Sequence, residues 1–174
     1  AGLQWTSLTL LSPYGTSVLL GAGDQCGGSW NTPAGGQLYN TTFDDEASDE
    51  IYSGTAPFSG SYQPAGDLSD FDNQSITGTW ELLINNRNNA SGTVEYIIMV
   101  ETDNSNPDDP PYYGTEYPSN NASFSGDDFT VIPIEITDSG TITDLNVSVI
   151  LDHSYNAGLQ WTSLTLLSPY GTSV

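Results

Sequence analysis

Residues 7–20 read "SLTLLSPYGTSVLL", and this stretch predicts a strand, a tight turn and a second strand. From Thr6 to Leu11 the apolar residues alternate, which places Leu8 and Leu10 on one face of an extended chain. The sequence "SPYG" at 12–15 then has proline and glycine where a type I turn prefers them. The beginning of the chain is therefore expected to form a β-hairpin.

The rest of the chain has the same character. We find no stretch of about eleven residues with the apolar spacing of an amphipathic helix, and Gly or Pro interrupts almost every candidate. Further strands are expected at 16–20, 78–84, 93–100, 129–136 and 142–151. Short strands separated by turn residues predict an all-β fold, a jelly-roll-like β-sandwich.

The beginning of the chain occurs twice. Residues 157–174 repeat residues 1–18 without a substitution, so the period is 156 residues (157 − 1). The segment "DNSNPDDPP" at 103–111 has no apolar residue and is expected to form a semi-rigid linker. The chain is thus interpreted as a circularly shifted window of a 156-residue repeat. Residues 1–102 would form strands of one unit, and 112–174 the first strands of the next unit, or of the same unit folded back.

The duplicated segment is the expected assembly strand. Leu8 and Leu10, with their copies Leu164 and Leu166, would face the core of a sandwich whose partner strands come from both sides of the linker. We favour the arrangement in which 114–156 reaches forward into the next unit, because main-chain hydrogen bonds would then join subunits head to tail. Folding back would leave 157–174 as a spare strand.

The charge of the chain restricts its partners. It has 22 acidic residues, one basic residue (Arg87) and a formal charge of −21, which disfavours nucleic acid and anionic membrane surfaces. No run approaches the ~20 apolar residues of a membrane helix, so membrane insertion is not expected. Without lysine, a Lys–Asn isopeptide bond within the chain is excluded.

The hydroxyl- and amide-rich composition suits an extracellular or cell-surface protein, whose export signal would lie upstream. The single Cys26 cannot form an internal disulfide, and an idle thiol is the simplest interpretation. Candidate N-glycosylation sequons lie at Asn40, Asn73, Asn89, Asn121 and Asn146.

Read from 112 to 156 and onward from 1 to 102, the unit resembles the P domain (P/Homo B domain) of kexin- and furin-like proteases and secreted bacterial proteins. The similar motifs are "VSVILDHSYN" at 147–156, "SLTLLSPYGTSVLL" at 7–20, "TTFDDEA" at 41–47, "GTAPFSGSYQPAGDLSDF" at 54–71 and "GTWELLI" at 78–84. The resemblance implies a jelly-roll β-sandwich without an active site of its own, which braces a catalytic domain or serves as an accessory. The segments 85–92 and 153–161 depart from the family pattern.

Acidic residues are the candidate metal ligands. In "FDDEASDE" at 43–50 several carboxylates lie close together, and calcium binds 6–8 oxygen ligands in such irregular loops. Calcium is therefore the one cofactor that the sequence indicates. The best candidates are Asp45, Asp44, Glu46 and Asp49, and the weaker ones are Asp67, Asp70, Asp72, Asp127 and Asp128.

The residue types argue against catalysis. His153 is the only histidine, and it matches a strand-end position of the P-domain pattern; the resemblance therefore implies a structural, hydrogen-bonding histidine and not a general base. No G-x-S-x-G nucleophile motif is present. Trp80 alternates with Leu82 and is expected in the core, whereas Trp30, flanked by Gly, Ser and Asn, is the exposed aromatic candidate for stacking on a sugar.

Three functions follow from these observations. The leading one is a non-catalytic structural unit of an extracellular repeat array or filament, such as a fibre, stalk or adhesin, whose partners are identical neighbouring units. The second is an accessory P domain that stabilises a secreted subtilisin-like protease. The third is a carbohydrate-binding module that contacts surface glycans.

Overall fold

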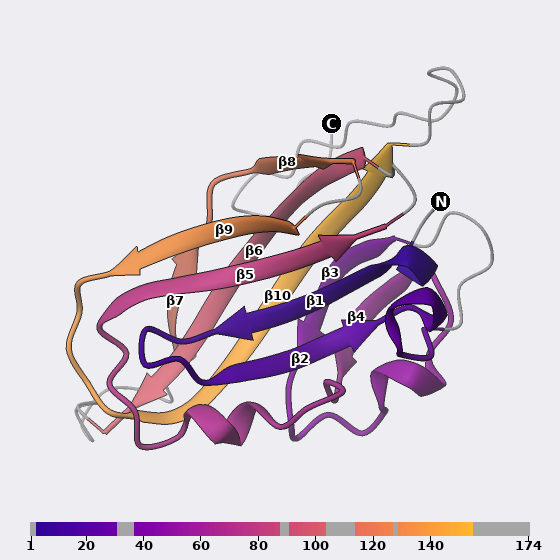
Figure 1. Cartoon of the computed structure of the whole chain (residues 1–174). Helices are drawn as coiled ribbons and strands as arrows, with labels where there is room; N and C mark the ends of the chain where they lie inside the picture. The colour runs from indigo at the N-terminus through magenta and orange to yellow at the C-terminus, as the bar shows by residue number, and fades with distance from the viewer. Residues whose placement is uncertain (1–2, 31–36, 88–90, 104–113, 127–128, 155–174) are drawn as a thin grey trace, which may run out of the picture.

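The computed structural model describes residues 3–30, 37–87, 91–103, 114–126 and 129–154, which form an all-β sandwich of two sheets (Figure 1). Within these ranges the helices are single turns of 3-10 type: η1 (Leu3–Trp5), η2 (Asp24–Cys26), η3 (Ile51–Ser53) and η4 (Leu68–Phe71). None of them has the length or apolar character to cross a membrane. The expected all-β fold is confirmed.

The four-stranded sheet contains the beginning of the chain. Its order is β2-β1-β5-β9, and all of its pairings are antiparallel. The strands are β1 (Thr6–Leu11), β2 (Ser17–Ala22), β5 (Gly78–Asn86) and β9 (Phe129–Ile136). Strand β1 is therefore an interior strand, and β2 lies at the sheet edge.

The six-stranded sheet contains the longest strands. Its order is β4-β3-β10-β6-β7, with β8 also paired to β6, and only the β3–β4 pairing is parallel among the described strands. The strands are β3 (Leu38–Phe43), β4 (Phe58–Tyr62), β6 (Ser91–Thr102), β7 (Thr115–Pro118), β8 (Ala122–Ser125) and β10 (Ile142–Ser154). Strands β6 and β10 form its centre.

The core lies between the two sheets. Alternate residues of β1, β5, β6, β9 and β10 are buried, as period-two alternation requires when one face of a strand covers the core. Trp80 is completely buried against Phe71, with ring centroids 5.1 Å apart, which confirms it as a core residue. The Tyr96 hydroxyl of β6 donates to the Ile132 carbonyl of β9 at 2.8 Å and so joins the two sheets.

The expected hairpin at the beginning of the chain is present. The Gly15 amide donates to the Ser12 carbonyl at 3.0 Å, which closes the four-residue turn between β1 and β2. Gly15 has φ +87°, and a side chain in this left-handed conformation would be strained. The turn residues therefore set the register in which β2 pairs with β1.

The described residues after the linker fold back onto the same chain. Strand β10 pairs with β6 along nearly its whole length and with β3 on its other side. This is the folded-back arrangement, and not the forward one that we favoured from the sequence. Within a single chain, 142–154 fills the position between strands 38–43 and 91–102 and so completes the six-stranded sheet. Residues 104–111, all of the expected linker except Asp103, lie outside the described residues.

Candidate functional site

Strand β1 is the part of the fold on which the assembly hypothesis rests. Leu8 and Leu10 are 0% exposed and face the core, as predicted. On the two sides of β1, hydrogen-bonded ladders run to β2 and β5. Leu164 and Leu166, the copies of Leu8 and Leu10, lie outside the described residues. The first copy of the repeated segment is thus an integral strand of the sandwich.

A buried polar cluster joins β1 to the end of β10. The Thr6 hydroxyl lies 3.2 Å from His153 Nε2 and 3.5 Å from Asn86 Oδ1. If Thr6 donates its proton to Asn86, it accepts from Nε2–H, which leaves Nδ1 as the unprotonated nitrogen. Within the described residues Nδ1 is buried and has no partner. Sequence analysis predicted a hydrogen-bonding histidine, but not its partner Thr6, which is 147 positions away, nor Asn86, the second partner of Thr6, which is 80 positions from Thr6.

Burial of this imidazole disfavours its charged form. The ring of Phe124 packs edge-on against His153, with ring centroids 5.2 Å apart. Burial lowers the pKa of His153 from 6.5 to about 4, although the neighbouring Asp152 carboxylate opposes the shift. His153 is therefore neutral near pH 7 and is a structural residue at the meeting point of the chain's first and last described strands.

Asp45, the best calcium candidate from the sequence, makes hydrogen bonds that support the fold. Its two carboxylate oxygens accept hydrogen bonds from the amides of Leu68 and Ser69 at 3.0 and 2.9 Å. These are the first N–H groups of η4, which have no partners within that short helix. Asp45 thus fixes the loop 44–50 to η4.

A cluster of carboxylates lies at the start of β10. The hydrogen bond shared with Asp44 raises the pKa of Glu46, and burial raises it further. Burial raises the pKa of Asp144, and the neighbouring Glu101 and Asp44 carboxylates raise it further. Asp144 was not a candidate from sequence, because it is far from the acidic loop in the chain and only strand pairing brings it near.

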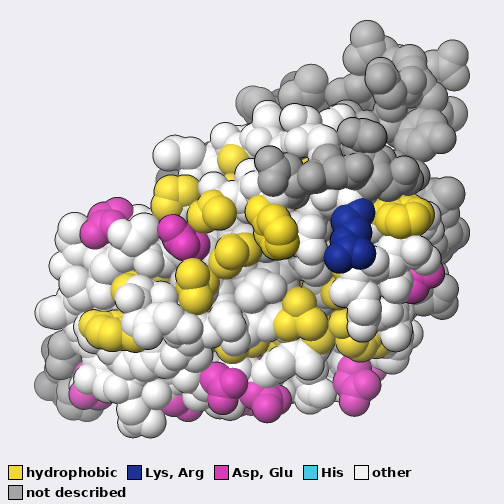
Figure 2. All heavy atoms as spheres, viewed as in Figure 1, with side chains coloured by type: hydrophobic (Ala, Val, Ile, Leu, Met, Phe, Trp, Pro, Cys, Tyr) yellow, Lys and Arg dark blue, Asp and Glu magenta, His cyan; other side chains and the backbone are white. Residues whose placement is uncertain are grey.

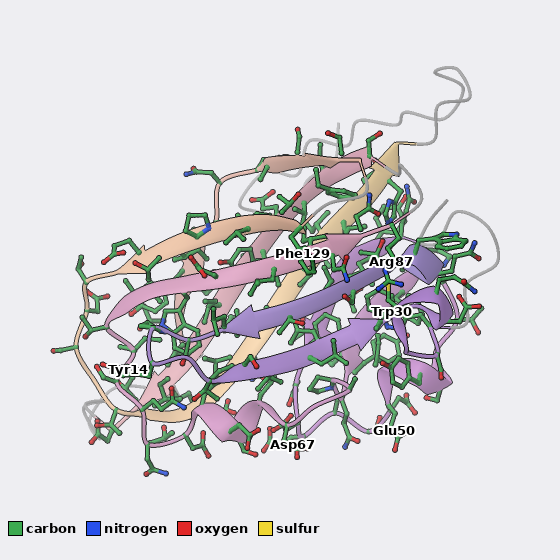
Figure 3. The ribbon with its side chains drawn as sticks, in the orientation of Figure 1. Tyr14, Trp30, Glu50, Asp67, Arg87 and Phe129 are labelled. Carbon is green, nitrogen blue, oxygen red and sulfur yellow. The ribbon has the colours of Figure 1, made fainter. Side chains whose placement is uncertain are left out.

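Of the remaining acidic candidates, Asp72 lies near this cluster: burial and the neighbouring Asp45 carboxylate raise its pKa, and Asp72 in turn raises the pKa of Asp144. Asp49, Asp67 and Asp70 are exposed, Asp72 is half-buried, and Asp127 and Asp128 lie outside the described residues. Figure 3 places Glu50 and Asp67 along the lower margin of the molecule. Among the described side chains, no group of three or more His, Cys, Asp or Glu is arranged to hold a metal ion. Calcium binding stays a prediction.

Calcium, if bound by the folded protein alone, should raise the melting temperature. A ligand at a hundredfold excess over its Kd stabilises by ~2.7 kcal/mol. We expect millimolar Ca²⁺ to raise the midpoint and a chelator to lower it, measured by thermal unfolding. The control is NaCl at matched ionic strength, because a protein with a charge of −21 also gains from screening. An equal rise in NaCl would contradict a specific calcium site.

Replacing Asp144 by asparagine should stabilise the protein at pH 7. Because the folded state raises the pKa of Asp144 above 3.8, its ionised form costs stability at neutral pH, and this cost disappears below pH 3.8. We expect Asp144→Asn to increase the free energy of unfolding by less than about 1 kcal/mol, the size of partly exposed charge interactions. Asp24→Asn, an exposed site with the same change of charge, is the control. Equal gains from both variants, or a gain that persists at pH 3, would contradict this assignment.

The sequence prediction for Trp30 is wrong. Its side chain is 2% exposed and packs over Gly21, where any Cβ would lie 2.3 Å from the indole ring. Its amide donates to the Ala22 carbonyl at 3.1 Å, and its ring lies 6.3 Å from that of Phe58. The surrounding Gly, Ser and Asn residues indicated a loop correctly, but the loop folds over β2 and buries the ring. Trp30 is therefore not available to stack on a sugar.

The predicted modification sites have different environments. Asn40, Asn73 and Asn121 are exposed. The Asn146 side chain is half-buried and donates to Asp144 Oδ2 at 3.2 Å, so a glycan there would have to replace this contact. Asn89 lies outside the described residues. Cys26 is a half-buried free thiol whose pKa is raised by burial.

The outer face of the four-stranded sheet carries exposed apolar side chains. Figure 2 shows hydrophobic groups across this face and Arg87 toward one end. Phe129 and Val131 on β9 are 64% and 46% exposed, and Leu19 on β2 is 37% exposed. The Arg87 guanidinium donates to the Gln25 carbonyl at 3.1 Å. The sheet therefore has a buried face and a solvated face with an apolar component.

Comparison with known proteins gave no match to a family model, a curated protein or a solved structure. The resemblance to the P domain therefore rests on the sequence motifs themselves.

Proposed function

We propose that this chain is a non-catalytic structural unit of an extracellular repeat array, in which neighbouring units are copies of the same 156-residue period. One observation carries the proposal. The segment that recurs without substitution contains an interior strand in its first copy, and the inward side chains of this strand, Leu8 and Leu10, are completely buried. A second copy of such a strand requires partner strands and a core to pack against, and an adjoining period of the same sequence would supply them.

The physical character of the unit supports this function. Without partner strands, an interior strand exposes unpaired backbone N–H and C=O groups and apolar side chains to water. An unpaired second copy is therefore energetically unfavourable. The surface charge of −21 keeps chains apart unless a specific contact joins them. With Trp30 buried, carbohydrate binding loses the residue that suggested it. The accessory-domain alternative rests on the sequence motifs that resemble the P domain.

Electron microscopy of a lengthened chain tests the proposal. A chain extended to three successive periods should give particles with three equal globular densities joined in a row, and the present chain should give one. The maximum dimension from solution scattering should increase with each added period. Compact aggregates, or one folded density with unfolded extensions, would contradict a repeat array.

A further inference from the structure

The surface that receives the beginning of the chain is well defined. We call the surface of residues 19–154 that contacts residues 3–18 the β1 slot. In it, Leu8 and Leu10 are 0% exposed. The Gly23 amide donates to the Thr6 carbonyl at 2.9 Å, and the Ser12 hydroxyl donates to Gln74 Oε1 at 2.9 Å. The β1 slot therefore recognises this segment by apolar side chains, backbone and hydroxyl groups together.

The β1 slot cannot distinguish the two copies by chemistry. Residues 157–174 are identical to 1–18, so every contact made by 3–18 has its counterpart in 159–174. Thr162 corresponds to Thr6, Leu164 to Leu8 and Leu166 to Leu10. Only the tether differs: the first copy continues directly into Leu19, whereas the second copy follows β10.

The second copy can reach the β1 slot of its own chain. Strand β10 ends at Ser154, and the neighbouring His153 already touches the first residue of β1, with 3.2 Å between Nε2 and Thr6 Oγ1. Figure 1 shows the end of β10 and the start of β1 at the same end of the molecule. The intervening residues 155–161 can span roughly 23 Å at ~3.3 Å per residue, more than this junction requires.

Strand β2 is anchored outside the repeated segment and can stay in place while the second copy replaces the first. Leu19 and Leu20 are held from outside the repeated segment, because the Gly66 and Ala65 amides donate to their carbonyls at 2.9 and 3.1 Å. Strand β2 is an edge strand, so a chain that departs at 18–19 enters solvent and crosses no other strand. The boundary of the repeat therefore coincides with a point where the fold tolerates a chain break.

We propose that the β1 slot is a docking site for residues 157–174 of the same chain, in exchange with residues 1–18. The inference rests on the proposed repeat function for its biological meaning. In an array, this docking places residues 19–174 in one unit, with residues 103–111 between its strands β6 and β7, so that the chain passes to the next unit after Val174. The released first copy then belongs to the preceding unit.

Leucine-to-aspartate variants of the full chain test the exchange, because a buried, unpaired carboxylate is incompatible with the β1 slot. The N-variant carries Leu8→Asp and Leu10→Asp, the C-variant Leu164→Asp and Leu166→Asp, and the third variant all four. We expect the N-variant and the C-variant to keep a complete cooperative thermal transition as monomers, and the four-substitution variant to lose it.

Limited proteolysis of the N-variant identifies the docked copy, since the substitutions give the two copies different masses. Residues 157–174 should be protected and residues 1–18 cleaved. Loss of the transition in the N-variant as well would overturn the proposal, and folding only as a concentration-dependent oligomer would overturn docking within the same chain. The proposed function has a separate test, because an array closed by the first copies would still give one density per period.

Discussion

Replacing Trp80 by alanine is expected to lower the free energy of unfolding by about 3–5 kcal/mol, as for other large-to-small core substitutions. Trp80 is completely buried on β5, the strand between β1 and β9. Its indole N–H donates to the Ile76 carbonyl at 2.8 Å, and its ring packs against Phe71. The substitution removes both contacts and leaves a cavity between the sheets.

Denaturant unfolding measures this loss. A domain of this size is commonly stable by ~5–15 kcal/mol, so the variant should be partly unfolded or have a much lower midpoint. Tyr14→Ala is the control, because Tyr14 is 61% exposed in the turn between β1 and β2 and should change stability by less than about 0.5 kcal/mol. A Trp80→Ala protein as stable as the Tyr14→Ala protein would show that Trp80 lies outside the core.

Replacing His153 by glutamine is expected to remove a pH-dependent part of the stability. The folded state lowers the pKa of His153 from 6.5 to about 4, so the folded protein favours the neutral imidazole. Its contribution is complete above pH 6.5 and is lost as the pH falls toward 4. The span of ~2.5 pKa units corresponds to about 3 kcal/mol.

The measurement is the difference in unfolding free energy between the parent protein and His153→Gln, followed from pH 8 to pH 4. Glutamine can still donate to Thr6 but does not titrate, so the parent should lose about 3 kcal/mol relative to the variant over this range. The difference is needed because protonation of Asp144 and Glu46, whose pKa values are raised, acts in the opposite direction. A difference that is constant with pH would contradict burial of the imidazole.

The central strands could be predicted from the sequence because their burial follows strict alternation. The pattern of β6, from Ser91 to Thr102, has inward Val94, Tyr96 and Ile98, and its register is therefore fixed by the apolar residues. Strands β3 and β4 were missed because they lack this alternation. In β3 the exposed Tyr39 is followed by Asn40 with φ 45°, and β4 contains Gly60 with φ +90°.

The candidate site was only partly predictable, because its contacts come from pairing across long sequence distances. The sequence identified the acidic loop, but not that Asp45 would accept hydrogen bonds from residues 23 and 24 positions away. It identified His153 as structural, but Thr6 becomes its neighbour only when β10 and β1 reach the same end of the sandwich. The duplicated segment was visible directly, and its importance follows from the burial of β1.

Calorimetry of a chain lengthened by one further period of 156 residues tests the repeat-unit account most directly. At about 0.7 kcal/mol per residue near 60 °C, each folded period should add roughly 100 kcal/mol of unfolding enthalpy. We predict that the added period contributes this enthalpy in full and unfolds at a midpoint no lower than that of the present chain. An unchanged unfolding enthalpy would mean that the second period does not fold beside the first, and would contradict the account.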